Sequence, residues 1–132
     1  MRKGFFLHTA EDGRVPPFHY VAAGAITPKL GTALYINSGV LAVASGTNKP
    51  TYISMIDCAS ALTSGTFIPV IEVHPDMIFE TSLSVDNAQA VGTAVTISSD
   101  GDQITNTTSS GKATIVEKDG GTAGDRALVK FL

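Results

Sequence analysis

Cysteine is almost absent from this sequence, since Cys58 is the only one in 132 residues. A single cysteine cannot close an intramolecular disulfide, so a disulfide-stapled secreted framework is excluded. Tryptophan is missing altogether, and charged residues make up only 16% of the chain, against about 25% in an ordinary globular domain. Serine, threonine, glycine and alanine take their place. The resulting neutral surface suits contact with another protein, because few charges must be desolvated.

Clustered positive charge and long apolar runs are also lacking. The net charge is −3, and the nine Lys and Arg residues are spread along the chain. Nucleic-acid binding normally requires a basic patch, so we expect no nucleic-acid partner. The first apolar run ends at His8, short of the roughly 7–15 residues of a signal-peptide core. No run approaches the roughly 18 residues of a membrane span. We therefore expect a soluble chain, made in the cytoplasm, with no membrane partner.

Catalytic and metal-binding patterns are likewise missing. Cys58 could act as a nucleophile with His74 as its base, but a lone cysteine is more often a small buried apolar residue. Ser109 and Lys112 form a Ser-x-x-Lys pattern, which lies in an expected turn and lacks its partner motifs. The three histidines are far apart in the sequence and follow no metal-ligand spacing. We predict that the protein is not an enzyme and binds no metal or cofactor.

What the chain does contain is many short runs rich in Val, Ile, Thr, Tyr and Phe, separated by glycine and proline. This pattern is typical of all-β proteins, and it predicts a small β-barrel or β-sandwich. Two short segments, 57–62 and 85–90, could each form one helical turn. The strands expected from the pattern are 18–23, 32–37, 40–44, 51–57, 66–73, 77–84, 94–98, 103–107, 112–118 and 127–131.

Two hairpins are marked by turn residues that tolerate positive φ, Asn37-Ser38-Gly39 and Asp100-Gly101. The strands that open them are alike. Residues 31–38 and 92–99 share Gly, Thr, Ala, Ile and Ser at five of eight positions, with a spacing of 61 residues. The likeness admits two interpretations, a duplicated half-barrel or two hairpins that converged on the same turn chemistry.

The first 17 residues differ from the remainder. They show no clear periodicity, and they hold three consecutive apolar residues, Phe5, Phe6 and Leu7, followed later by Pro16 and Pro17. Paired prolines favour extended chain. We therefore divide the sequence into an N-terminal extended arm, 1–17, and a single β-rich domain, 18–132. The alternative is that Phe5–Leu7 belong to an ordinary first strand that closes the barrel.

Several stretches resemble the small head-decoration proteins of tailed bacteriophages that infect Gram-positive hosts. The segments that carry the resemblance are turn and strand sequences rather than catalytic signatures: 13–16 (GRVP), 23–29 (AGAITPK), 41–55 (LAVASGTNKPTYISM) and 68–73 (IPVIEV). The resemblance covers most of the chain. The general plan, an N-terminal arm before a β-barrel or β-tulip body, is also similar.

The resemblance implies a capsid cement protein with no catalytic residues. Such a protein is made in the bacterial cytoplasm and sits on the outer surface of the virion. There it binds the major capsid protein, self-associates, typically as a homotrimer, and stabilises the assembled head. The candidate partner-binding residues lie in the arm: Phe5, Phe6, Leu7, Arg14, Pro16 and Pro17.

Three other functions fit parts of the sequence. Another virion component, such as a head-tail connector or a tail subunit, has the same structural class. A non-viral β-rich module that binds carbohydrate or a cell-surface partner is a further option, although a sugar platform would be expected to expose Trp. A small hydrolase is the least supported, for want of a nucleophile-base pair.

Overall fold

The protein is described by a computed structural model in which residues 3–9 and 18–131 are placed. These residues form ten strands and no helix, and about 43% of them are in strands or bridges, well above the average of about 20–25%. Within this part of the chain no helix has the length and hydropathy of a membrane span. The strands are β1 (Phe6–Thr9), β2 (Phe18–Ala23), β3 (Ala33–Asn37), β4 (Val40–Val43), β5 (Tyr52–Ser54), β6 (Thr66–Glu72), β7 (Ile78–Ser82), β8 (Ala94–Val95), β9 (Ala113–Lys118) and β10 (Arg126–Phe131).

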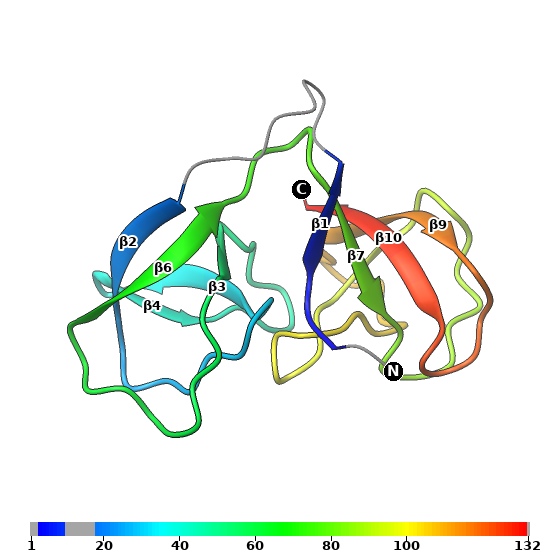
Figure 1. Ribbon diagram of the computed structural model, residues 1–132. Helices are drawn as coiled ribbons and strands as arrows, with labels where there is room; N and C mark the ends of the chain where they lie inside the picture. Colours follow the sequence, from blue (N-terminus) through cyan, green and yellow to red (C-terminus); the bar gives the residue numbers. More distant parts are fainter. Residues whose placement is uncertain (1–2, 10–17, 132) are drawn as a thin grey trace.

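The all-β class is therefore confirmed, and nine expected strands were placed within a few residues of their observed positions. The expectation of one small barrel or sandwich of β-tulip type is not confirmed, because the strands divide into two sheets. Neither 57–62 nor 85–90 is helical. The strand expected at 103–107 is reduced to bridges made by Ile104. Figure 1 shows the two groups of strands as two lobes, with β1 between them.

The first lobe is a closed ring of five strands in the order β2-β4-β3-β5-β6. Four of its contacts are antiparallel, and the ring closes through a parallel contact between Ala23 of β2 and Leu41 of β4. The β3–β4 hairpin turns at Ser38 and Gly39, whose φ angles are +53° and +85°. These values are those of the predicted hairpin turn. Alternate side chains of the ring point inward to a small core that includes Leu34, Leu41, Ile68 and Val70.

The second lobe has the same order of neighbouring strands as the first. Its sheet has the order β1-β7-β10-β9-β8, and isolated bridges complete the circle of neighbours. Ile97, after β8, pairs antiparallel with Ile104, and Ile104 pairs in parallel with Leu83, just after β7. The parallel Leu83–Ile104 contact corresponds to the Ala23–Leu41 contact that closes the first ring. β2, β5 and β6 thus correspond to β7, β9 and β10.

Backbone hydrogen bonds match across the two lobes, far beyond the two similar hairpins. The spacing of 61 residues between Gly31 and Gly92 recurs between Ser54 and Ile115. Local convergence of two turns does not account for a match that extends over the whole of each lobe. The interpretation as an internal repeat is therefore the one that the structure favours. The matched bonds, first lobe before second, are Gly31 N to Ser54 O and Gly92 N to Ile115 O; Ser54 N to Thr32 O and Ile115 N to Thr93 O; Thr51 N to Leu34 O and Lys112 N to Val95 O; Gly24 N to Leu41 O and Ser84 N to Ile104 O; Gly65 N to Ala23 O and Gly124 N to Leu83 O.

Among the described residues, no strand of the first lobe corresponds to β1. It pairs antiparallel with β7, with Phe6 opposite Glu80 and Leu7 opposite Phe79. Phe5, just before it, is 1% exposed and belongs to the larger core cluster, which contains residues of both lobes. Its ring meets that of Phe131 edge-on at a centroid distance of 5.1 Å. Residues 6–9 thus form a strand of the sheet, and Phe5, just before them, packs in the core.

Candidate protein-binding surface

An apolar surface covers the outside of the β2–β6 pair. Val21 and Ala23 of β2 point into the first-lobe core, so the alternate residues of this strand point outward. Phe18 and Tyr20 are 56% and 68% exposed, and Phe67 on β6 is 67% exposed. The register sets Tyr20 opposite Pro69 and Ala22 opposite Phe67. We call the outward set Phe18, Tyr20, Ala22, Phe67 and Pro69 the aromatic face.

The aromatic face contains no charged side chain, so its exposed apolar residues form a patch that no charge interrupts. Single exposed apolar residues are common on soluble proteins, whereas contiguous apolar patches mark interaction sites. The nearest ion pair on β2 and β6 joins His19 and Glu72 at 3.4 Å, with both side chains about half exposed. His19 alternates with Val21, and Glu72 alternates with Val70, so both side chains lie on the core side of their strands. They lie at one end of the barrel. The aromatic face therefore stays neutral.

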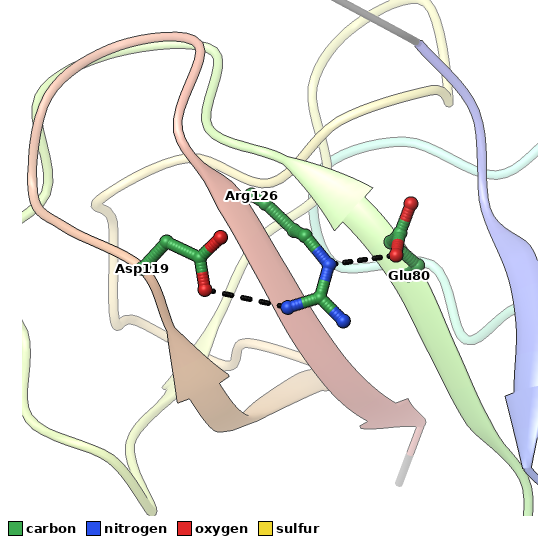
Figure 2. Close-up of polar contacts among 3 residues, drawn as sticks. All are labelled: Glu80, Asp119 and Arg126. Carbon is green, nitrogen blue, oxygen red and sulfur yellow. Dashed lines mark hydrogen bonds and ion pairs between the residues drawn. The ribbon is translucent and has the colours of Figure 1, made fainter.

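The corresponding surface of the second lobe is charged. By the repeat, Tyr20 corresponds to Glu80 on β7, and Phe67 corresponds to Arg126 on β10. Arg126 donates from Nε to Glu80 Oε1 at 2.7 Å and from a terminal nitrogen to Asp119 Oδ1 at 3.3 Å, as Figure 2 shows. The hydrogen bond with Glu80 raises the pKa of Arg126 above its ordinary value. One fold thus carries two chemically opposite surfaces at equivalent places.

An apolar cleft of about 420 Å³ lies between β1 and the first lobe. Phe6 and Leu7 line one side, and Leu30, Met55 and Ile71 line the other. Ile71 stands opposite Phe18 in the β2–β6 register, so the cleft begins where the aromatic face ends. The two features form one apolar region across the junction of the lobes.

The partner-binding residues expected from the sequence fall into three groups. Phe5 is a core residue in this structure, because it fills the space beside Phe131 and leaves almost no surface for a partner. Phe6 and Leu7 are half-buried in β1 and reach the cleft. Arg14, Pro16 and Pro17 lie outside the described residues. The expected arm at 1–17 is accordingly not confirmed, since residues 6–9 form a strand that pairs with β7.

Reactive side chains are scattered in the described part of the chain. Cys58 is buried, and its carbonyl oxygen accepts a hydrogen bond from Lys29 Nζ at 2.5 Å. Among the described residues no group of three or more His, Cys, Asp or Glu side chains gathers as metal ligands would. The predicted absence of catalysis and of cofactors stays a prediction.

Phe18 and Phe67 were not recognised from the sequence as surface residues. A signal existed in the alternation of 18–23 and 66–72, where large apolar residues occupy both faces of each strand. A half-buried strand normally alternates apolar with polar residues. Comparison with protein-family models, with curated proteins and with solved structures finds no match to this chain.

Proposed function

We propose that the protein binds the outer surface of an assembled bacteriophage head and stabilises it, as a non-catalytic decoration protein. The aromatic face is the single observation that supports a protein partner most strongly. Full burial of a large apolar side chain contributes about 1.5–3 kcal/mol. Three side chains that are each more than half exposed could therefore contribute roughly 3–5 kcal/mol to binding.

The choice of a capsid as the partner is supported by the sequence resemblance to head-decoration proteins. In this proposal the major capsid protein contacts the aromatic face and the adjoining cleft, including Phe6 and Leu7. Arg14, Pro16 and Pro17 are retained as further proposed contacts. Self-association into homotrimers on the head, and the family's β-tulip-like plan, are part of the same proposal.

The test replaces two residues of the aromatic face with the charged residue types found at the corresponding positions of the second lobe. The double variant Tyr20→Glu, Phe67→Arg recreates on the first lobe the charge arrangement that Glu80 and Arg126 form on the second. Each side chain sits on an exposed position, so we expect wild-type folding. Val91→Glu, which changes another exposed apolar residue (62%) outside the face, is the matched control.

Binding is measured by co-sedimentation with heads purified without the protein. We expect the double variant to bind about 100-fold more weakly or worse, since about 1.4 kcal/mol corresponds to a factor of ten, and Val91→Glu to bind as wild type. Equal binding of all three proteins would remove the aromatic face from the contact. Binding of the wild type to tails or necks in preference to heads would favour the connector or tail alternative.

A further inference from the structure

We propose that the edge of β2 away from β6, where the only described pairing is that of Ala23 with β4, is an acceptor for an added strand, and that its occupant is an extended segment of a partner protein. We call this the free edge of β2. The segment runs antiparallel to β2 and carries uncharged, large apolar side chains. This inference deepens the proposed function and rests on it only for the identity of the partner as a capsid subunit.

The internal repeat supplies the template. β7 has antiparallel partners on both sides, β10 on one and β1 on the other. β2, its counterpart, has β6 along its whole length, but on the other side it meets β4 only at Ala23. In Figure 1, β1 lies along β7, whereas no labelled strand lies along the outer edge of β2. The position that β1 fills on β7 therefore has no described strand on β2.

The hydrogen-bonding direction of β2 follows from Pro69. Proline has no N–H, and the Pro69 carbonyl accepts from Met55 N at 3.0 Å, on the side away from β2. Tyr20, which stands opposite Pro69, is thus in a non-hydrogen-bonded pair with β6. Its own N–H and C=O point to the free edge, and those of Phe18, two residues earlier, point the same way. Glu80, the counterpart of Tyr20, stands opposite Phe6 of β1.

Within residues 18–23, β2 also lacks three features that commonly protect edge strands. Edges are commonly blunted by lysine, proline or a bulge, and the sequence of β2, FHYVAA, contains neither lysine nor proline. Its register with β6 runs without interruption from Phe18 to Ala23. An added strand would extend the aromatic face sideways, and its large side chains would pair across the strand with Phe18 and Tyr20.

The chemistry of the partner segment is inferred from β1, which pairs with the equivalent edge of β7. β1 offers β7 an extended, uncharged run, Phe6-Leu7-His8-Thr9, in which one large apolar residue faces outward and the next faces the core. The neutral aromatic face would leave a charge on the incoming strand without a partner. A partner segment with the character of β1 therefore fits the edge better than a charged one.

The probe is a synthetic peptide with the sequence of residues 4–9 (GFFLHT), capped at both ends and titrated into the full-length, ¹⁵N-labelled protein. We expect saturable shifts of the backbone amides of 18–22. Tyr20→Pro, which removes an N–H that points to the free edge and leaves the β6 ladder intact, should abolish these shifts. Tyr20→Thr, which keeps the N–H, should still bind. If Tyr20→Pro fails to fold, Phe18→Pro at the first residue of the strand takes its place.

Other results would overturn the inference. Shifts confined to 78–82 would mean that the peptide only exchanges with β1, and the absence of shifts would mean that the edge accepts no strand. A dimer in light scattering that Tyr20→Pro dissociates would identify a second copy as the occupant. The peptide titration uses no heads. If it fails while the double variant still abolishes head binding, the proposed function stands without this mode of binding.

Discussion

Replacing Phe5 by alanine tests whether the N-terminal segment belongs to the core. Phe5 is 1% exposed and packs edge-on against Phe131, which in turn contacts Phe79 at a centroid distance of 5.4 Å. Truncation of a buried phenylalanine costs about 3–5 kcal/mol. A domain of ordinary stability, about 5–15 kcal/mol, loses a large part of its margin. At roughly 3–5 °C per kcal/mol for a chain of this size, Tm falls by roughly 10–25 °C.

The assay is equilibrium denaturation in urea with calorimetry, and Phe18→Ala is the matched control. The side chain of Phe18 is 56% exposed, so its truncation should cost about 1 kcal/mol or less. Deleting residues 1–9 removes both Phe5 and β1, and we expect it to destabilise at least as much as Phe5→Ala. If Phe5→Ala or the deletion leaves stability within about 1 kcal/mol of wild type, the packing argument fails and the detached arm becomes the better description.

Two further predictions concern stability away from the aromatic face. Gly101 has a φ of +69°, and an added Cβ would lie 2.6 Å from Val43 Cγ1, so Gly101→Ala should lower the free energy of unfolding by about 2–4 kcal/mol. Gly39→Ala meets only the strain of its φ of +85° and should cost about 1 kcal/mol; equal costs in urea denaturation would contradict this difference. Glu80→Gln breaks an ion pair whose side chains are about one-third exposed, so it should lower Tm only slightly, and by less in high salt. A Tm loss that is unchanged by salt would show that packing, not charge, holds Arg126.

Local patterns predicted most of the strands, because turn chemistry and β-branched runs are read from neighbours in sequence. β2 was predicted to the residue, and the Ser38-Gly39 turn follows from the positive φ that it requires. The strand at Phe6–Thr9 was only an alternative, because what makes it a strand is pairing with β7, about 70 residues away. Such long-range pairing leaves little trace in a short apolar run.

The repeat shows the same limit. Only Gly31–Ser38 and Gly92–Ser99 retain an obvious likeness, whereas β2 and β7 share no residue at corresponding positions. The backbone bonds that reveal the repeat do not depend on side chains, so side chains outside the core were free to diverge. For the same reason the outward-facing residues differ between the lobes: Tyr20 and Phe67 lie on the first lobe where Glu80 and Arg126 lie on the second.

The proposed binding residues could not be ranked from the sequence alone, because the exposure of a side chain depends on which face of its strand points away from the core. Phe5 and Phe18 are the same residue type in similar apolar surroundings. One is a core residue and the other a surface residue, as a result of the register of β1 and β2 with partners far along the chain.

In the proposed function, the aromatic face contacts the outer surface of the capsid. Electron cryo-microscopy of heads decorated with the purified protein tests it most directly. We expect density on the outer surface of the head, oriented so that Phe18, Tyr20 and Phe67 face the capsid subunits and the Glu80–Arg126 surface does not occupy the equivalent contact. Density at the neck or tail, or a capsid contact made by another surface while the aromatic face stays open to solvent, would contradict the account.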